Sequence, residues 1–145
     1  MTEIERSEQD RVNEAVDEIS DKLERATHDL KWLEGYFVAT LSTDQAVGFA
    51  LRVIEKVDIA GEVLSGLATL ASKGGNTPAF ESWVAGIRGR VRAAFSSIKG
   101  ILSVIQTNLM DYAIEILEDF LCVMDTIEKL RDTPTEILQA AVTRL

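Results

Sequence analysis

Carboxylates are the most abundant side chains in this sequence that could do chemistry, and the chemistry they suggest is metal binding. The chain has 24 Asp and Glu residues but one His and one Cys, which excludes zinc sites and nucleophilic triads that need several His or Cys residues. The pairs Glu18-x-x-Asp21 and Glu115-x-x-Glu118 have the spacing that places two carboxylates on one helix face, as some magnesium-dependent hydrolases require. Such pairs arise by chance among so many acids, so metal-dependent hydrolysis is only a third alternative. We expect no catalytic residue, no metal and no cofactor.

Basic side chains are concentrated in one segment of this acidic chain, whose formal net charge is -9. Residues 77–106 carry four basic residues and one acidic residue. On a helix, Arg88, Arg92 and Lys99 would fall within about 40° of one another, and Phe95 would lie on the same stripe, away from the apolar seam. Two interpretations stay open. The cations could pair with acids on neighbouring helices, or the stripe could bind an acidic partner with Phe95 as an apolar anchor.

Two aromatic residues form a second candidate contact site. Trp32 and Tyr36 lie one helical turn apart, and Trp32 falls outside the apolar seam of its segment. Either another helix covers this pair, or the pair is an exposed aromatic patch that contacts a partner.

Apolar residues recur at helical spacing along the chain, and sustained period-2 alternation is absent. Thr77-Pro78 and Thr133-Pro134 have the cap-then-proline pattern of helix starts, and Gly74-Gly75 is typical of a helix end. The predicted helices are 7–40, 43–73, 78–106, 109–131 and 134–143.

Three of these helices carry a continuous apolar seam with a strict alternation of four- and three-residue steps. This rhythm indicates either the core of an intramolecular bundle or, for residues 7–40, a coiled coil with another chain. The expected seams are Val12, Val16, Ile19, Leu23, Ala26, Leu30, Leu33 and Phe37; Ala50, Ile54, Val57, Gly61, Leu64, Ala68 and Ala71; and Phe80, Val84, Ile87, Val91, Ala94, Ile98, Ile101 and Ile105.

Short connections make sequential helices antiparallel, and 145 residues suit one domain. We therefore predict an all-α fold over residues 1–145: an up-down antiparallel four-helix bundle of long helices with a short fifth C-terminal helix.

The segment 59–72 is apolar nearly all round and has small residues along one face: Gly61, Ser65, Ala68 and Ser72. Small residues let helices approach closely. The segment is expected to be either a tightly packed central helix or part of a hairpin, residues 59–105, that enters lipid.

The absence of a catalytic set favours a non-enzymatic helical bundle that acts by protein–protein interaction, as an adaptor, an inhibitor or a small subunit of a complex. The expected partner is another protein, or a second copy through the helix 7–40. The alternative is a membrane-acting bundle of the pore-forming or cell-death effector type. Because phosphates would be repelled by the net charge, nucleic acid is not expected as a partner. A charged N-terminus and a single Cys favour a cytoplasmic location.

Overall fold

The computed structural model describes residues 2–40, 48, 58–105 and 107–145. Every element within these ranges is helical, which confirms the predicted all-α fold. The predicted helix 43–73 is helical at Gly48 and from residue 59 onward, but Asp58 is not helical, so the prediction of one continuous helix is wrong at this position. Residues 43–47 and 49–57 lie outside the described ranges. The elements are α1 (Glu3–Thr40), α3 (Ile59–Lys73), α4 (Pro78–Ile105), a 3₁₀ turn η1 (Thr107–Leu109), α5 (Met110–Lys129) and α6 (Thr135–Val142).

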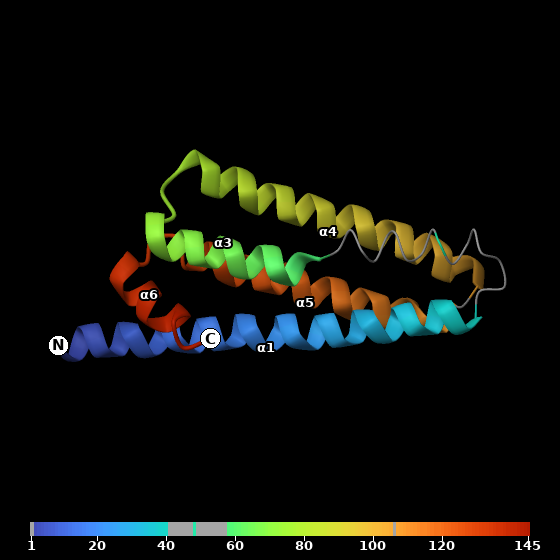
Figure 1. Ribbon diagram of the computed structural model, residues 1–145, viewed down its shortest axis with the longest axis horizontal. Coiled ribbons are helices and arrows are strands. Elements are labelled where there is room, and N and C mark those ends of the chain that lie inside the picture. The colour runs from blue at the N-terminus through green and yellow to red at the C-terminus, as the bar shows by residue number, and fades with distance from the viewer. Residues whose placement is uncertain (1, 41–47, 49–57, 106) are drawn as a thin grey trace.

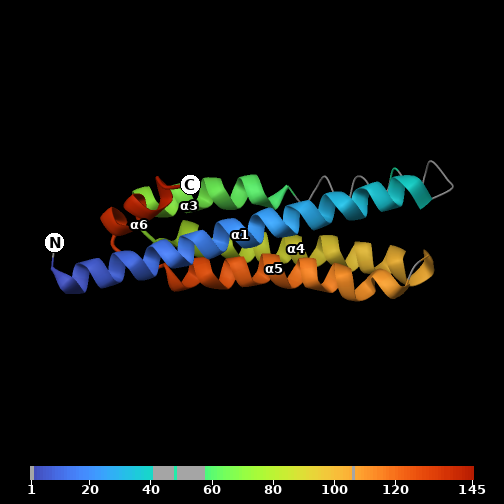
Figure 2. The same ribbon diagram turned by 90° about the horizontal axis from the view of Figure 1, so that it is seen from below.

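Consecutive long helices run in opposite directions, as Figure 1 shows for α1, α3, α4 and α5. The turn η1 separates α4 from α5, so these two segments are not one continuous helix. The short helix α6 packs against both α1 and α3, near the end of the bundle where the chain begins (Figure 2). This arrangement confirms the predicted up-down bundle with a short fifth helix.

The seam of α1 is confirmed at every position. Its eight residues, from Val12 to Phe37, are all buried, mainly against α5 and α6. Because helices of the same chain already cover this seam, the structure follows the intramolecular interpretation rather than a coiled coil with another chain. At the N-terminal end of α1, Ile4 is 81% exposed.

The seam of α4 departs from the prediction after Val91. The buried residues are Phe95, Ile98 and Leu102, whereas Ala94 is only partly buried. A straight α-helix drifts by about 20° per heptad from a 3.5-residue repeat. The buried residues Ile87, Val91 and Phe95 are separated by two successive steps of four residues. These steps correct the drift and bring the larger Phe95 into the core in place of Ala94.

The seam predicted for α3 is wrong at Gly61, Leu64 and Ala68, which are exposed. The buried face of α3 is displaced from the predicted seam, since Val63 is fully buried whereas the neighbouring Leu64 is 43% exposed. The same helix exposes all four members of its small-residue face, so it is not a tightly packed central helix. The buried residues of α3 are Ile59, Val63, Leu67, Leu70 and Ala71.

The ends of α3 and α4 follow the predicted signals. Gly74 has φ 81°, and its N–H donates to the Leu70 carbonyl at 2.8 Å, which closes α3. A side chain at Gly75 would overlap the backbone of Arg131, so this turn requires glycine. The Thr77 hydroxyl accepts the Phe80 N–H at 3.1 Å and caps α4.

Candidate binding groove

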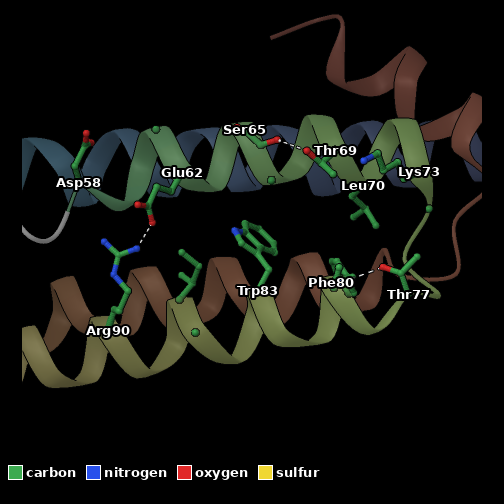
Figure 3. A pocket seen from close by; sticks show the side chains of 16 residues that line it. Asp58, Glu62, Ser65, Thr69, Leu70, Lys73, Thr77, Phe80, Trp83 and Arg90 are labelled. Carbon is green, nitrogen blue, oxygen red and sulfur yellow. Dashed lines mark hydrogen bonds and ion pairs between the residues drawn. The ribbon is translucent and has the colours of Figure 1, made fainter.

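A groove of about 760 Å³ runs between α3 and α4 (Figure 3). It forms because α3 packs more extensively against α6 than against α4, while the residues that α3 turns towards α4 are small. The lining is mostly apolar, and its walls are formed by Gly61, Ser65, Gly66, Thr69 and Leu70 from α3 and by Phe80, Trp83, Gly86 and Ile87 from α4.

Trp83 lies in the middle of the groove, with its ring pointing from α4 towards α3 (Figure 3). A Cβ atom at Gly66 would overlap this ring, so the indole occupies the space that a side chain at position 66 would need. Phe80 lies one turn away, with ring centroids 6.1 Å apart. Trp83 remains partly exposed, so the centre of the groove presents an aromatic surface to whatever enters it.

One polar side chain in the middle of the α3 wall is already satisfied within the helix. The Thr69 hydroxyl donates to the Ser65 carbonyl at 3.1 Å, so this hydroxyl can lose water at small cost.

Charged side chains mark the two ends of the groove. At one end, the ion pair between Arg90 and Glu62 connects α4 to α3, as Figure 3 shows, and Asp58 stands beside it. Lys73 lies at the opposite end. Among the described residues, Asp58 and Lys73 make no ion pair and no side-chain hydrogen bond. Asp58 directly precedes α3 and Lys73 lies in its last turn, so among the described lining residues one end of the groove carries an acidic side chain and the other a basic side chain.

The predicted basic strip is only partly assembled. Phe95 was expected on the exposed stripe, and that prediction is wrong: its side chain is fully buried, with its ring centroid 6.2 Å from that of Phe120. Arg88 bonds across to α5, at 2.6 Å to Glu128 and to Asp125 as well, which follows the interpretation of pairing between helices. Arg92 is exposed and Lys99 is half-buried.

The predicted aromatic pair is present and is larger than expected. Trp32 and Tyr36 are stacked with centroids 5.9 Å apart, and Tyr112 of α5 meets the Trp32 ring edge-on at 5.2 Å. Burial, together with the nearby Asp29, raises the pKa of Tyr112 to about 12. Trp32 is 49% exposed, so α5 covers this pair only in part.

The described residues do not bring together a group of three or more His, Cys, Asp or Glu side chains that could hold a metal ion. No helix within these ranges combines the length and apolar character needed to cross a membrane. Comparisons of the chain with protein-family models, curated proteins and solved structures found no match.

Trp83 was not among the predicted site residues, because it lies next to Val84 and outside the predicted seam of α4. A signal was nevertheless present in the two segments together. The segment 59–72 exposes small residues, and the next helix carries a tryptophan three residues after Phe80, at a height where it can meet Gly66.

Proposed function

We propose that this protein is a non-enzymatic binding module, and that the groove between α3 and α4 receives an apolar segment of a partner protein. The observation that supports this proposal is the partly exposed Trp83 ring, held against Gly66 in the centre of a mostly apolar groove. Tryptophan is among the residue types that are enriched at the energetic centre of protein interfaces. Its rigid ring offers a large contact area at a low cost in conformational entropy.

The size of the groove is compatible with either a small ligand or a peptide, because pockets for small ligands span about 300–1,000 Å³. Its form favours a peptide. The groove is bounded by two helices, follows α3 from Asp58 to Lys73 and is open to solvent along its exposed lining residues. In helix-in-groove recognition, an amphipathic helix places its apolar face into an apolar groove of this kind.

The test is a comparison of three bait proteins in a quantitative pull-down from a lysate of the source cells. Thr69→Trp places a large side chain in the groove, whereas Ala68→Trp places the same side chain on an exposed position of α3 outside the groove. We expect a partner that the wild type and Ala68→Trp recover equally and that Thr69→Trp loses. The interaction should then be reproduced with the two purified proteins.

Recovery of the same proteins by all three baits would contradict the proposal. The melting temperatures of the three baits should agree within a few degrees, since both substitutions are on exposed positions.

The stacked Trp32–Tyr36 pair is proposed as a second contact surface for the same or another partner, because half of the Trp32 side chain is exposed. A Trp32→Ala bait tests this surface independently of the groove. Loss of a partner from this bait alone would assign that partner to the aromatic pair, whereas an unchanged recovery would remove the pair as a contact site.

A membrane-acting bundle would give a different result in a liposome experiment. The proposal predicts that the purified chain leaves dye-loaded anionic liposomes intact over a wide pH range. Rapid release of the dye would contradict the proposal and favour insertion of the hairpin 59–105.

A further inference from the structure

We infer that the partner segment is an amphipathic helix of about four turns that binds antiparallel to α3, with an acidic first turn and a basic last turn. This inference rests on the proposed function and specifies the partner chemistry of the same groove. It is carried by the charges at the two ends of the groove and by the small side chains of its α3 wall.

The length of the partner helix follows from the positions of Asp58 and Lys73, which make no ion pair among the described residues. Asp58 and Lys73 are 15 positions apart, which is about 22 Å along a helix at 1.5 Å per residue. Both residues line the groove. A partner helix of the same length would therefore place its terminal turns beside these two side chains.

The orientation follows from the signs of those charges. The Asp58 end attracts a basic group on the partner, and the Lys73 end attracts an acidic group. Helices favour acidic residues in the first turn and basic residues in the last turn, because those charges complement the helix dipole. Only an antiparallel helix satisfies both requirements, since its last turn lies beside Asp58 and its first turn lies beside Lys73.

The apolar face of the partner should carry large side chains. Gly61, Ser65 and Thr69 leave the α3 wall shallow, and Trp83 and Ile87 supply apolar surface on the opposite wall. A second copy of this chain is a poorer occupant. If its exposed α3 face entered the groove, it would contribute small side chains, whereas the shallow α3 wall requires large ones.

The experiment uses the 145-residue chain with Trp32→Phe, which leaves Trp83 as its sole tryptophan. Two synthetic 18-residue helical peptides share one Leu- and Phe-rich face. The acid-first peptide has Glu in its first turn and Lys in its last turn, and the base-first peptide has these charges exchanged. Trp83 fluorescence is titrated with each peptide at low ionic strength.

We expect the acid-first peptide to bind about five- to tenfold more tightly, a preference typical of two partly exposed charge pairs at the ends of an interface. The double variant Asp58→Lys with Lys73→Glu should reverse this preference. The neutral double variant Asp58→Asn with Lys73→Gln should abolish the preference for the acid-first peptide. This variant replaces the charge-reversed one if the reversed charges destabilise α3. Raising the salt concentration should reduce the preference in every case.

Equal affinity of the two peptides, or a preference for the base-first peptide, would overturn the orientation and leave the proposed function standing. If neither peptide changes Trp83 fluorescence, both the inference and the proposed groove function fail. A concentration-dependent molecular mass that Thr69→Trp abolishes would assign the groove to a second copy and also overturn the inference.

Discussion

The contact between Trp83 and Gly66 predicts that the two glycines Gly66 and Gly89 respond differently to the same substitution. Alanine is a better helix former than glycine by about 0.5–1 kcal/mol. Gly89 lies in α4, and a Cβ atom built there meets nothing within 4 Å, so Gly89→Ala should stabilise the protein by that amount. At Gly66 the added methyl group would overlap the Trp83 ring, which must then leave its place.

The size of this effect can be estimated from the cost of overpacking. Forcing an extra methyl group against a packed side chain costs about 1–3 kcal/mol, which exceeds the gain in helix propensity. Gly66→Ala should therefore give a free energy of unfolding that is lower than that of Gly89→Ala by about 1–3 kcal/mol. In a Trp83→Ala background the overlap is absent, and Gly66→Ala should become stabilising.

The assay is urea unfolding followed by circular dichroism. The double-mutant cycle uses the wild type, Gly66→Ala, Trp83→Ala and the variant that carries both substitutions, and Gly89→Ala is unfolded in the same way. The double-mutant cycle should give a coupling energy of about 1–3 kcal/mol. A coupling below about 0.5 kcal/mol, the range for independent sites, would show that the indole does not lie against Gly66 and would refute the described shape of the groove.

Three further predictions concern the sites outside the groove. Phe95→Ala should lower the free energy of unfolding by about 3–5 kcal/mol because the ring is fully buried. Arg92→Ala, one turn earlier, should change it by less than about 0.5 kcal/mol. If both substitutions had the same small effect in chemical denaturation, the burial of Phe95 would be contradicted. Arg88→Met should cost about 1 kcal/mol or less, since the carboxylates it meets are largely exposed, and a loss that does not shrink at high salt would contradict an ionic origin. Tyr112 has a pKa of about 12 in the fold against about 10 for an ordinary tyrosine, so its stabilising contribution is complete below pH 10 and is lost as the pH rises to about 12. Tyr112→Phe should remove the phenolate absorbance that appears last in an alkaline titration, and an unchanged titration curve would contradict this assignment.

The fold could be predicted because its main signal is local. In α1, all eight seam positions could be identified from spacing alone, since one apolar face per helix determines which side turns inward. The turn at Gly74 and the cap at Thr77 could be predicted for the same reason, because each depends on residues only a few positions away.

The candidate site could not be predicted in the same way, because it depends on how two helices are placed relative to each other. Whether Phe95 or Ala94 enters the core depends on accumulated helical drift along α4. The exposure of Gly61 and Ala68 depends on α3 packing mainly against α6. The spacing of residues within α3 does not show which helix it packs against. The role of Trp83 follows only from the groove that this packing leaves between α3 and α4.

Binding of a partner helix in the proposed groove between α3 and α4 can be observed residue by residue. The experiment is a nuclear magnetic resonance titration of the isotopically labelled chain with the acid-first peptide. We expect the largest shifts at the backbone amides of Ser65, Gly66 and Thr69 and at the indole N–H of Trp83. Shifts concentrated around Trp32 and Tyr112, or no shifts at a saturating peptide concentration, would contradict the claim.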